Sequence, residues 1–372
     1  MKIISTAILS CFAALTLCAA PKGGGDAIAQ LLNSRSAGSP KAFEEAAEVV
    51  AAEAREGKIL QQFLVAVLSR EQGAPKCLQI DEETRKEYFA NSSKRIEALA
   101  ERKSNALAWY LLSLEKNDVR LLKKAADAGN VQALNNWGTI TLTQALANPG
   151  VETNDVEMIL HSSFKAFETA AGKGDSNGLY NLGMCYMEGY GCLRDPEKAF
   201  THFKASAELG HPEAINNLGA FYRDGVVVRK DLAEAARQFA RSADLGNAYG
   251  QLNYALALQR GEGLPRDSER AARLFRDAAE KGNLEAVNAY AMCLFAGDGV
   301  KKDVRLAVRW YTVAAERGLS AAMENLAACY EAGLGGLERS ERKALLWKMR
   351  ARAARGDRNA AAWVMQNSEG KP

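Results

Sequence analysis

The chain has 372 residues, of which 48% are hydrophobic and 25% are charged, and its formal net charge at pH 7 is +3. This near-neutral balance argues against a nucleic-acid-binding protein, which would carry a marked excess of basic residues. The length is unusual for one compact core, whereas an array of small repeats has no such limit.

Residues 1–20 have the layout of a secretory signal peptide. Lys2 precedes an apolar stretch that ends in the small residues Cys18, Ala19 and Ala20. Pro21 would block cleavage after Ala20, so Ala19 is the better cleavage position. In the alternative interpretation Cys18 is the lipid-bearing residue of a lipoprotein. We therefore expect an exported protein, periplasmic or secreted, whose membrane contact is limited to a lipid on Cys18.

Residues 21–100 form the next predicted region. Gly23 to Ser39 is a spacer that contains glycine and serine. From Ala42 onward, apolar residues recur with helical spacing up to about residue 100. We expect an irregular helical region, in which no motif identifies a function.

Two irregular repeats are predicted next. Residues 105–129 resemble a shortened helix pair, because Asp118 to Gly129 spans 11 residues where Asp195 to Gly210 spans 15. Residues 130–174 form a longer repeat, because the equivalent glycines at 129 and 174 are 45 residues apart. The later repeats are 36 residues long, so we expect a nine-residue insertion near residues 145–155.

Five regular repeats cover residues 175–362. Two glycine series keep an interval of 36 residues: Gly174, Gly210, Gly246, Gly282 and Gly318, and Gly189, Gly225, Gly261, Gly297 and Gly333. A period of 20–50 residues is typical of arrays in which each repeat buries its apolar face against its neighbours. Function is therefore expected on a surface of the array.

Each regular repeat encodes two helices. In the second helix of one repeat, Asp195 is a good N-cap, Pro196 suits the first helical position and Gly210 supplies the left-handed residue that ends the helix. The first helix carries a small residue, such as Gly183, where a partner helix must come close. It ends in a Gly-x-Gly link, which the repeat with Gly225 lacks.

The repeated pattern resembles a known family. The motif Ala-x-x-Asn-Leu-Gly-x-x-Tyr-x-x-Gly-x-Gly-Val, a short basic link, Asp, and then Ala-x-x-x-Tyr-x-x-Ala-Ala-x-x-Gly is similar to the Sel1-like repeat, a relative of the tetratricopeptide repeat. The resemblance covers residues 175–362 over five consecutive repeats. It implies an exported bacterial member with an all-α fold, in which a right-handed α/α solenoid over residues 101–367 follows the irregular N-terminal region.

Five cysteines follow the predicted leader, and the odd number argues against a complete disulfide framework. Three of them, at positions 185, 293 and 329, occupy one repeat position, which is typical of a packing residue. Cys185 and Cys192 flank a tight turn and are the one pair to test for a disulfide, with two buried thiols as the alternative.

Motifs for catalysis, cofactors and metals are weak throughout the chain. His161, His202 and His211 fall at unrelated repeat positions, so we expect no metal site and no catalytic histidine. Ser162-x-x-Lys165 and Ser340-x-x-Lys343 match the Ser-x-x-Lys element of penicillin-recognising enzymes, but the accompanying elements are absent. We expect no cofactor and no enzymatic activity.

Two further features are interpreted as structural. Asparagines recur in register at positions 181, 217, 253 and 325, and their side chains are expected to bond the adjacent loop backbone. Residues 339–358 are the most basic stretch, which we interpret as the solvated face of the last helix pair, with an anionic partner as the sharper alternative.

By analogy with tetratricopeptide grooves, the first helix of each repeat would line a binding groove for a protein or peptide. The predicted groove residues are Tyr180, Met184, Met187, Asn216, Ala220, Arg223, Leu252, Gln259, Asn288, Met292, Phe295, Glu324 and Glu331. Their mixed apolar, amide and charged character suits a peptide segment better than a small polar metabolite.

The sequence thus predicts a non-catalytic protein-interaction scaffold of the bacterial cell envelope. The alternative is an enzyme with weak β-lactamase or peptidoglycan-directed hydrolase activity. In a third interpretation the N-terminal region carries the specific function and the repeats tether it. The sequence names neither the partner nor the oligomeric state.

Overall fold

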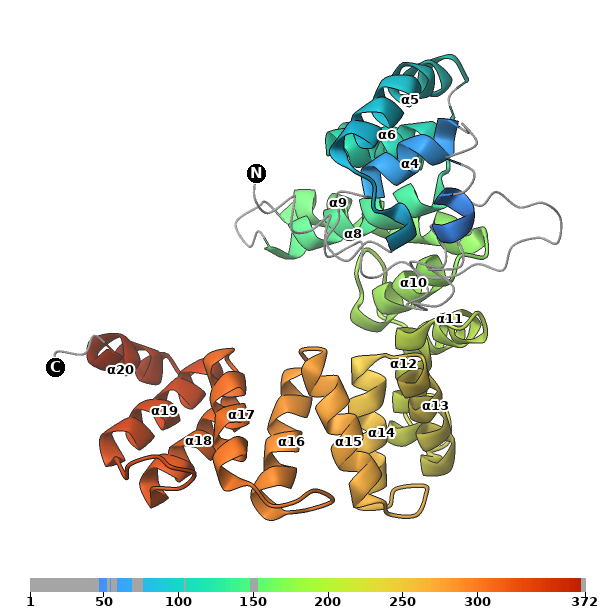
Figure 1. Cartoon of the computed structure of the whole chain (residues 1–372). Helices are drawn as coiled ribbons and strands as arrows, with labels where there is room; N and C mark the ends of the chain where they lie inside the picture. The colour runs from blue at the N-terminus through green and yellow to red at the C-terminus, as the bar shows by residue number, and fades with distance from the viewer. Residues whose placement is uncertain are drawn as a thin grey trace. The chain divides into compact units, whose positions relative to one another are not determined.

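The computed structural model describes residues 47–51, 54, 59–68, 76–103, 105–147 and 153–368 (Figure 1). The predicted leader, Cys18 and the spacer lie outside the described residues. Every regular element in the described ranges is a helix, which confirms the predicted all-α fold. The chain falls into two compact units, residues 1–218 and 219–372, and the boundary between them lies within helix α12 (Pro212–Asp224).

The first compact unit holds the helical N-terminal region and the irregular repeats. Its elements are α4 (Ile59–Leu68), η1 (Lys76–Leu78), α5 (Glu82–Lys103), α6 (Ala106–Lys116), α7 (Val119–Asp127), α8 (Val131–Ala147), α9 (Thr153–Gly172), α10 (Ser176–Glu188) and α11 (Pro196–Glu208). Consecutive helices from α6 to α11 pack against one another. A single buried cluster extends from Ala47 through Phe63 and Tyr110 to Ala170.

The second compact unit contains repeats of two helices, and all of these helices but the last two have 13 residues. Its elements are α13 (Leu232–Asp244), α14 (Ala248–Arg260), α15 (Ser268–Glu280), α16 (Leu284–Ala296), α17 (Val304–Glu316), α18 (Ser320–Ala332), α19 (Glu341–Ala354) and α20 (Arg358–Ser368). The even-numbered helices α14, α16 and α18 are first helices, and each packs on the second helix that follows it. The structure therefore has the predicted solenoid of helix pairs.

The predicted insertion lengthens a helix pair. Helix α8 has 17 residues and α9 has 20, whereas the helices of the regular repeats have 13. Residues 148–152, between the two helices, lie outside the described residues. The extra residues therefore extend both helices of the pair. The glycine spacing gave the number of extra residues, but it could not show that they would be helical.

Helix ends follow the predicted capping residues. The carboxylates of Asp195, Asp231, Asp267 and Asp303 each accept a hydrogen bond from the backbone N–H three residues later. At the end of α10, Gly189 has φ +81° and its N–H donates to the carbonyl of Cys185. These bonds satisfy backbone groups that a helix leaves unpaired at its ends.

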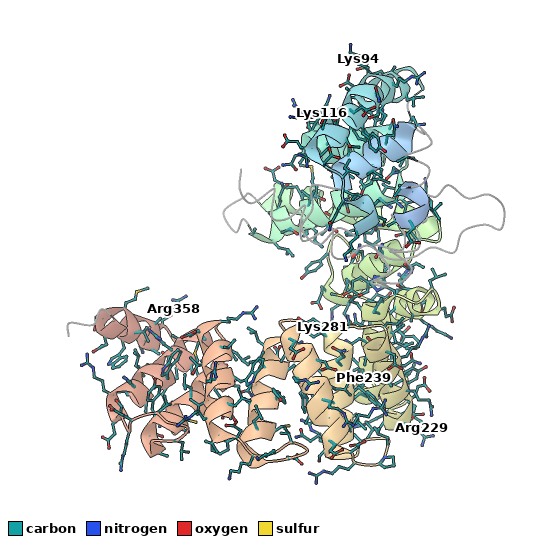
Figure 2. All side chains as sticks on the ribbon, viewed as in Figure 1. Lys94, Lys116, Arg229, Phe239, Lys281 and Arg358 are labelled. Atoms are coloured by element: carbon teal, nitrogen blue, oxygen red, sulfur yellow. The ribbon has the colours of Figure 1, made fainter. Side chains whose placement is uncertain are left out.

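The core of each repeat is built from an aromatic ring against a small residue. Phe203, Phe239 and Phe275 are almost fully buried on α11, α13 and α15. A side-chain carbon at Gly183 would lie only 2.8 Å from the Phe203 ring, so glycine lets the two helices approach. Figure 2 shows Phe239 among the helices of its repeat and Arg229 at the outer edge.

The second glycine of the Gly-x-Gly link has a separate role. Gly299 has φ +70°, and a side-chain carbon there would overlap the carbonyl of Ser268 in the preceding second helix. The link therefore packs directly onto the start of α15. Gly318 has φ +100°, but a side-chain carbon there would meet no neighbouring atom within 4 Å, so only its backbone conformation requires glycine.

We predict that Gly299→Ala lowers the free energy of unfolding by more than Gly318→Ala does. Both changes place a side chain at positive φ, which costs about 1–3 kcal/mol, but only Gly299→Ala also forces the link away from α15. Denaturant unfolding followed by circular dichroism compares the two variants. Equal losses of stability would contradict close packing of the link.

Candidate functional site: the first-helix face

Most of the predicted groove residues recur at helical positions that the repeat core leaves open. We call the second-unit part of this surface the first-helix face, made of Leu256, Gln259, Arg260, Asn288, Met292, Phe295, Ala296, Glu324 and Glu331, together with Arg223 at the end of α12. Residues at i, i+3, i+4 and i+7 share one side of a helix, so each first helix contributes one strip.

Side-chain bonds tie neighbouring first helices together across this face. The Asn325 Nδ2 atom on α18 donates to the Asn288 Oδ1 atom on α16 over 2.8 Å. The Gln259 Nε2 atom on α14 donates to the Asp298 Oδ2 atom, which follows α16, over 3.1 Å. These bonds link α14 to the turn after α16, and α16 to α18.

Met292 is the most exposed large apolar side chain of this surface, with 52% of its area accessible. Phe295 is half-buried, and its ring centroid lies 6.5 Å from that of Tyr311 in the core. Leu252, a predicted groove residue, lies in the core at 8% exposure and so does not line the surface. Leucine at that position turns inward because the neighbouring helices offer it apolar contacts.

Opposite charges lie at the two ends of the face. Arg223 forms two bonds with Asp224, of 2.7 and 3.0 Å, and its guanidinium lies 6.0 Å from the centre of the Phe239 ring. On α18, Glu324 pairs with Arg355 at 2.8 Å and Glu331 pairs with Lys348 at 2.5 Å.

The basic stretch at 339–358 supplies two of these partners, Lys348 and Arg355. A third residue, Arg352, pairs with Asp357 at 2.6 Å, and Arg350 lies 4.7 Å from the centre of the Trp347 ring. These contacts agree with the interpretation of the stretch as the surface of the last helix pair.

In the first compact unit, two of the predicted groove residues contact side chains of the next repeat. The Tyr180 ring stacks on His211, with centroids 4.5 Å apart and an interplanar angle of 15°. The Met184 sulfur accepts a weak hydrogen bond from Asn217 over 3.7 Å. Met187 and Asn216 are half-buried. Tyr180 is therefore a packing residue as much as a surface residue.

The interpretation of the asparagine series was wrong for two members. Asn217 bonds the side chain of Met184, and Asn325 bonds the side chain of Asn288, so neither bond goes to a loop backbone. Both bonds run to the preceding first helix. A local pattern could not reveal this, because the partner lies more than thirty residues away in the chain.

Sequence reasoning missed Tyr249, which is 57% exposed on α14, and the bridging role of Asp298. Tyr249 precedes Leu256 by seven residues and so lies on the same side of α14. That helical spacing was the available signal. Asp298 also accepts a bond from Arg266 over 3.1 Å.

The Ser-x-x-Lys matches have structural contacts. Ser340 is the N-cap of α19 and accepts the N–H of Lys343, whose ammonium group lies 5.5 Å from the centre of the Tyr330 ring. Ser162 is exposed, and Lys165 pairs with Glu168 at 2.7 Å. These contacts lend no support to either serine as an activated nucleophile.

Cys185 and Cys192 are both thiols in this structure. The Cys192 Sγ atom donates to the Cys185 carbonyl over 3.4 Å, and burial raises the pKa of the Cys185 thiol to about 12. Burial also raises the pKa of the Cys192 thiol. A disulfide between them stays a prediction.

No group of histidine, cysteine and acidic side chains in the described ranges could hold a metal ion. Across those same ranges, no helix is both long and apolar enough to span a membrane.

Two ionisable residues occupy the buried N-cap position of consecutive first helices. Asp175 caps α10 by accepting the Gly178 N–H over 2.8 Å, and it also accepts a bond from Asn135 over 2.6 Å. Burial raises the pKa of the Asp175 carboxyl from 3.8 to about 6, because these donors do not fully replace water. Asn247 and Asn283 hold the same position in later repeats.

His211 caps α12 with a neutral imidazole. Its Nδ1 atom accepts the Ala214 N–H over 3.3 Å, while Nε2 lies 3.1 Å from Asn177 Oδ1 and so carries the proton. Burial lowers the pKa of His211 from 6.5 to about 3. The Glu213 carboxylate lies 3.3 Å from Nδ1. An ion pair between them would need a proton on Nδ1, but Nδ1 accepts the Ala214 N–H and so carries none.

Comparison with known proteins identifies the repeats. The Sel1 repeat family model matches residues 119–130, 176–211, 212–247, 248–283, 284–319 and 320–347. Among solved structures, the chain is similar to a Sel1 repeat protein from Oxalobacter formigenes, with 26% identity, a TM-score of 0.56, and coverage of 66% of this chain and 96% of that chain.

The chain is also similar to a protective antigen present in uropathogenic Escherichia coli strains, which displays an SLR fold. The identity is 26% and the TM-score 0.55, over 87% of this chain and 68% of that chain. No curated protein matches the chain in sequence.

We predict that Asp175→Asn stabilises the protein at pH 7 by about 1–3 kcal/mol, since it removes a buried charge and keeps an N-cap. The pKa of Asp175 is raised in the folded state. The stability that the protonated carboxyl contributes is therefore fully present below pH 3.8 and is lost as pH rises through 6. The gain should therefore disappear near pH 3.5. Denaturant midpoints at pH 3.5, 5 and 7 measure it, and a loss of stability at pH 7 would contradict the buried charge.

We predict that His211→Asn reduces the sensitivity of the fold to acid. The pKa of His211 is lowered in the folded state, so its contribution is present above pH 6.5 and is lost as pH falls towards 3. Between pH 7 and 4.5 the protein with His211 should lose about 2 kcal/mol more of its free energy of unfolding than the His211→Asn variant does. Thermal melts of both proteins across this range would show parallel pH profiles if His211 were exposed.

Proposed function

We propose that this chain, whose residues 176–347 match the Sel1 repeat family, is a non-catalytic scaffold of the bacterial cell envelope that binds a partner protein segment on the first-helix face. Sel1-repeat proteins are generally protein-interaction scaffolds. The binding surface and the envelope location are the parts that we propose for this protein in particular.

The exposure of Met292 on α16, near the bond that joins α16 to α18, carries the proposal. Most other large apolar side chains of α16 pack in the core, whereas Met292 is 52% exposed beside the Asn288–Asn325 bond. A flexible thioether next to amide groups suits a protein segment, because methionine adapts to varied apolar side chains and amides pair with main-chain groups.

The envelope location rests on the predicted leader at residues 1–20. Residues in that range lie outside the described part of the chain, so the sequence pattern alone supports export. Lipid attachment at Cys18 remains the alternative to simple cleavage after Ala19.

We predict that Met292→Glu abolishes partner capture, while Val313→Glu, on the second helix α17 of the same repeat, does not. Val313 is 42% exposed, so both changes place one carboxylate on an exposed site of similar size. Loss of methionine burial alone would weaken binding about tenfold or more. The full-length protein is immobilised, and proteins captured from an envelope extract are quantified by mass spectrometry.

Circular dichroism of the two variants provides the folding control. Unchanged capture by Met292→Glu, or equal loss in both variants, would contradict a binding site on the first-helix face.

A further inference from the structure

We propose that the first-helix face selects a dipolar segment, with an acidic group bound beside α14, apolar residues on α16 and a basic group beside α18. This inference rests on the proposed function, because it names the chemistry of the partner at the same surface. It concerns only the second compact unit.

The charges and apolar groups follow one order along the repeats. Arg223 on α12 and Arg260 on α14 lie at the start of the face, Met292 on α16 lies in the middle, and Glu324 and Glu331 lie on α18. Residues 223, 259, 295 and 331 are separated by 36 positions and so form one column, Arg-Gln-Phe-Glu. The sign of the charge therefore changes from the first repeat of the column to the last.

The basic end contains a small cavity. Arg223, Arg260, Glu262, Asn253 and Leu256 line a space of about 30 Å³ together with residues of α13. Such a space admits a group about the size of one water molecule. Arg223 and Arg260 bring two guanidinium groups to this space and Glu262 brings one carboxylate, so one oxygen of an entering carboxylate could pair with an arginine in place of Glu262.

Internal ion pairs do not block this site. Arg260 and Glu262 are 3.7 Å apart and both are substantially exposed. The pairs Arg223–Asp224, Glu324–Arg355 and Glu331–Lys348 are exposed as well. Exposed pairs typically contribute about 0–1 kcal/mol, so a partner charge can replace one member at little cost.

The middle of the face offers a main-chain contact. Asn288 accepts the Asn325 amide, while its own Nδ2 atom contacts only the Met292 sulfur in the bonds described, over 3.6 Å. Sulfur is a weak acceptor, so a peptide carbonyl would be a better partner for this donor. Met292 then covers the adjacent apolar side chain of the bound segment.

The spacing limits the length of the segment. Directly packed helices lie about 8–10 Å apart, and successive first helices are linked here by side-chain bonds, so the two steps from α14 to α18 cover at least about 20 Å. An extended peptide spans this distance with about six residues. A ligand that carries only negative charge, such as a lipid headgroup or a nucleic acid, would have to displace Glu324 and Glu331 from Arg355 and Lys348. A basic group of a peptide could pair with the two glutamates directly, so a peptide with both signs fits better.

Three labelled octapeptides test the inference against the full-length protein by fluorescence anisotropy. The dipolar probe is Glu-Glu-Ser-Leu-Ser-Leu-Lys-Lys, and the two controls replace its lysines by glutamates or its glutamates by lysines. We expect the dipolar peptide to bind at least fivefold more tightly than either control. Arg260→Glu should shift the preference to the all-basic peptide, and Glu331→Arg should shift it to the all-acidic one.

Arg273→Glu, on the second helix α15, is the matched control and should leave the peptide preference unchanged. Arg273 pairs with Glu269 at 3.6 Å, much as Arg260 pairs with Glu262 at 3.7 Å. Equal binding of the three peptides, no binding of any, or an unchanged preference in both face variants would overturn the inference. If capture in the extract experiment still depends on Met292, the proposed function survives that failure.

Discussion

The close contact between a small residue on one helix and an aromatic ring on the next is the constraint on which each repeat depends. Gly183 faces Phe203 in one repeat, and Gly219 faces Phe239 in the next. With these rings almost fully buried, the two helices of a repeat must lie close together. Much of the side of the first helix that faces away from the ring is then exposed or half-buried.

The exposure of that side explains why the candidate site is a surface and not a pocket. Met292, Glu324 and Glu331 are exposed on it, while neighbouring positions on the same helices are buried. The Asn288–Asn325 bond links two adjacent first helices, so the groups on α16 and α18 follow one another in a fixed order along the repeats. Ordered charges and one adaptable apolar side chain suit selection among protein segments.

Periodicity made the helix pairs predictable, because the second helices carry recurring aspartate caps and a buried ring that faces a small residue on the first helix. Asp195 and its equivalents cap as expected, and Gly189 ends α10 as expected. Side chains with long-range partners were harder to predict. Tyr180 stacks on His211 of the next repeat, and Leu252 turns into the core, since each depends on neighbours that the local pattern does not contain.

Photo-crosslinking from single positions tests most directly whether the first-helix face binds the partner. A photoreactive side chain is placed at residue 292 or at residue 313 of the full-length chain, and the crosslinked proteins in an envelope extract are identified. A binding surface on the first helices predicts one specific adduct from residue 292 and none from residue 313. The same adduct from both positions, or an adduct only from residue 313, would contradict it.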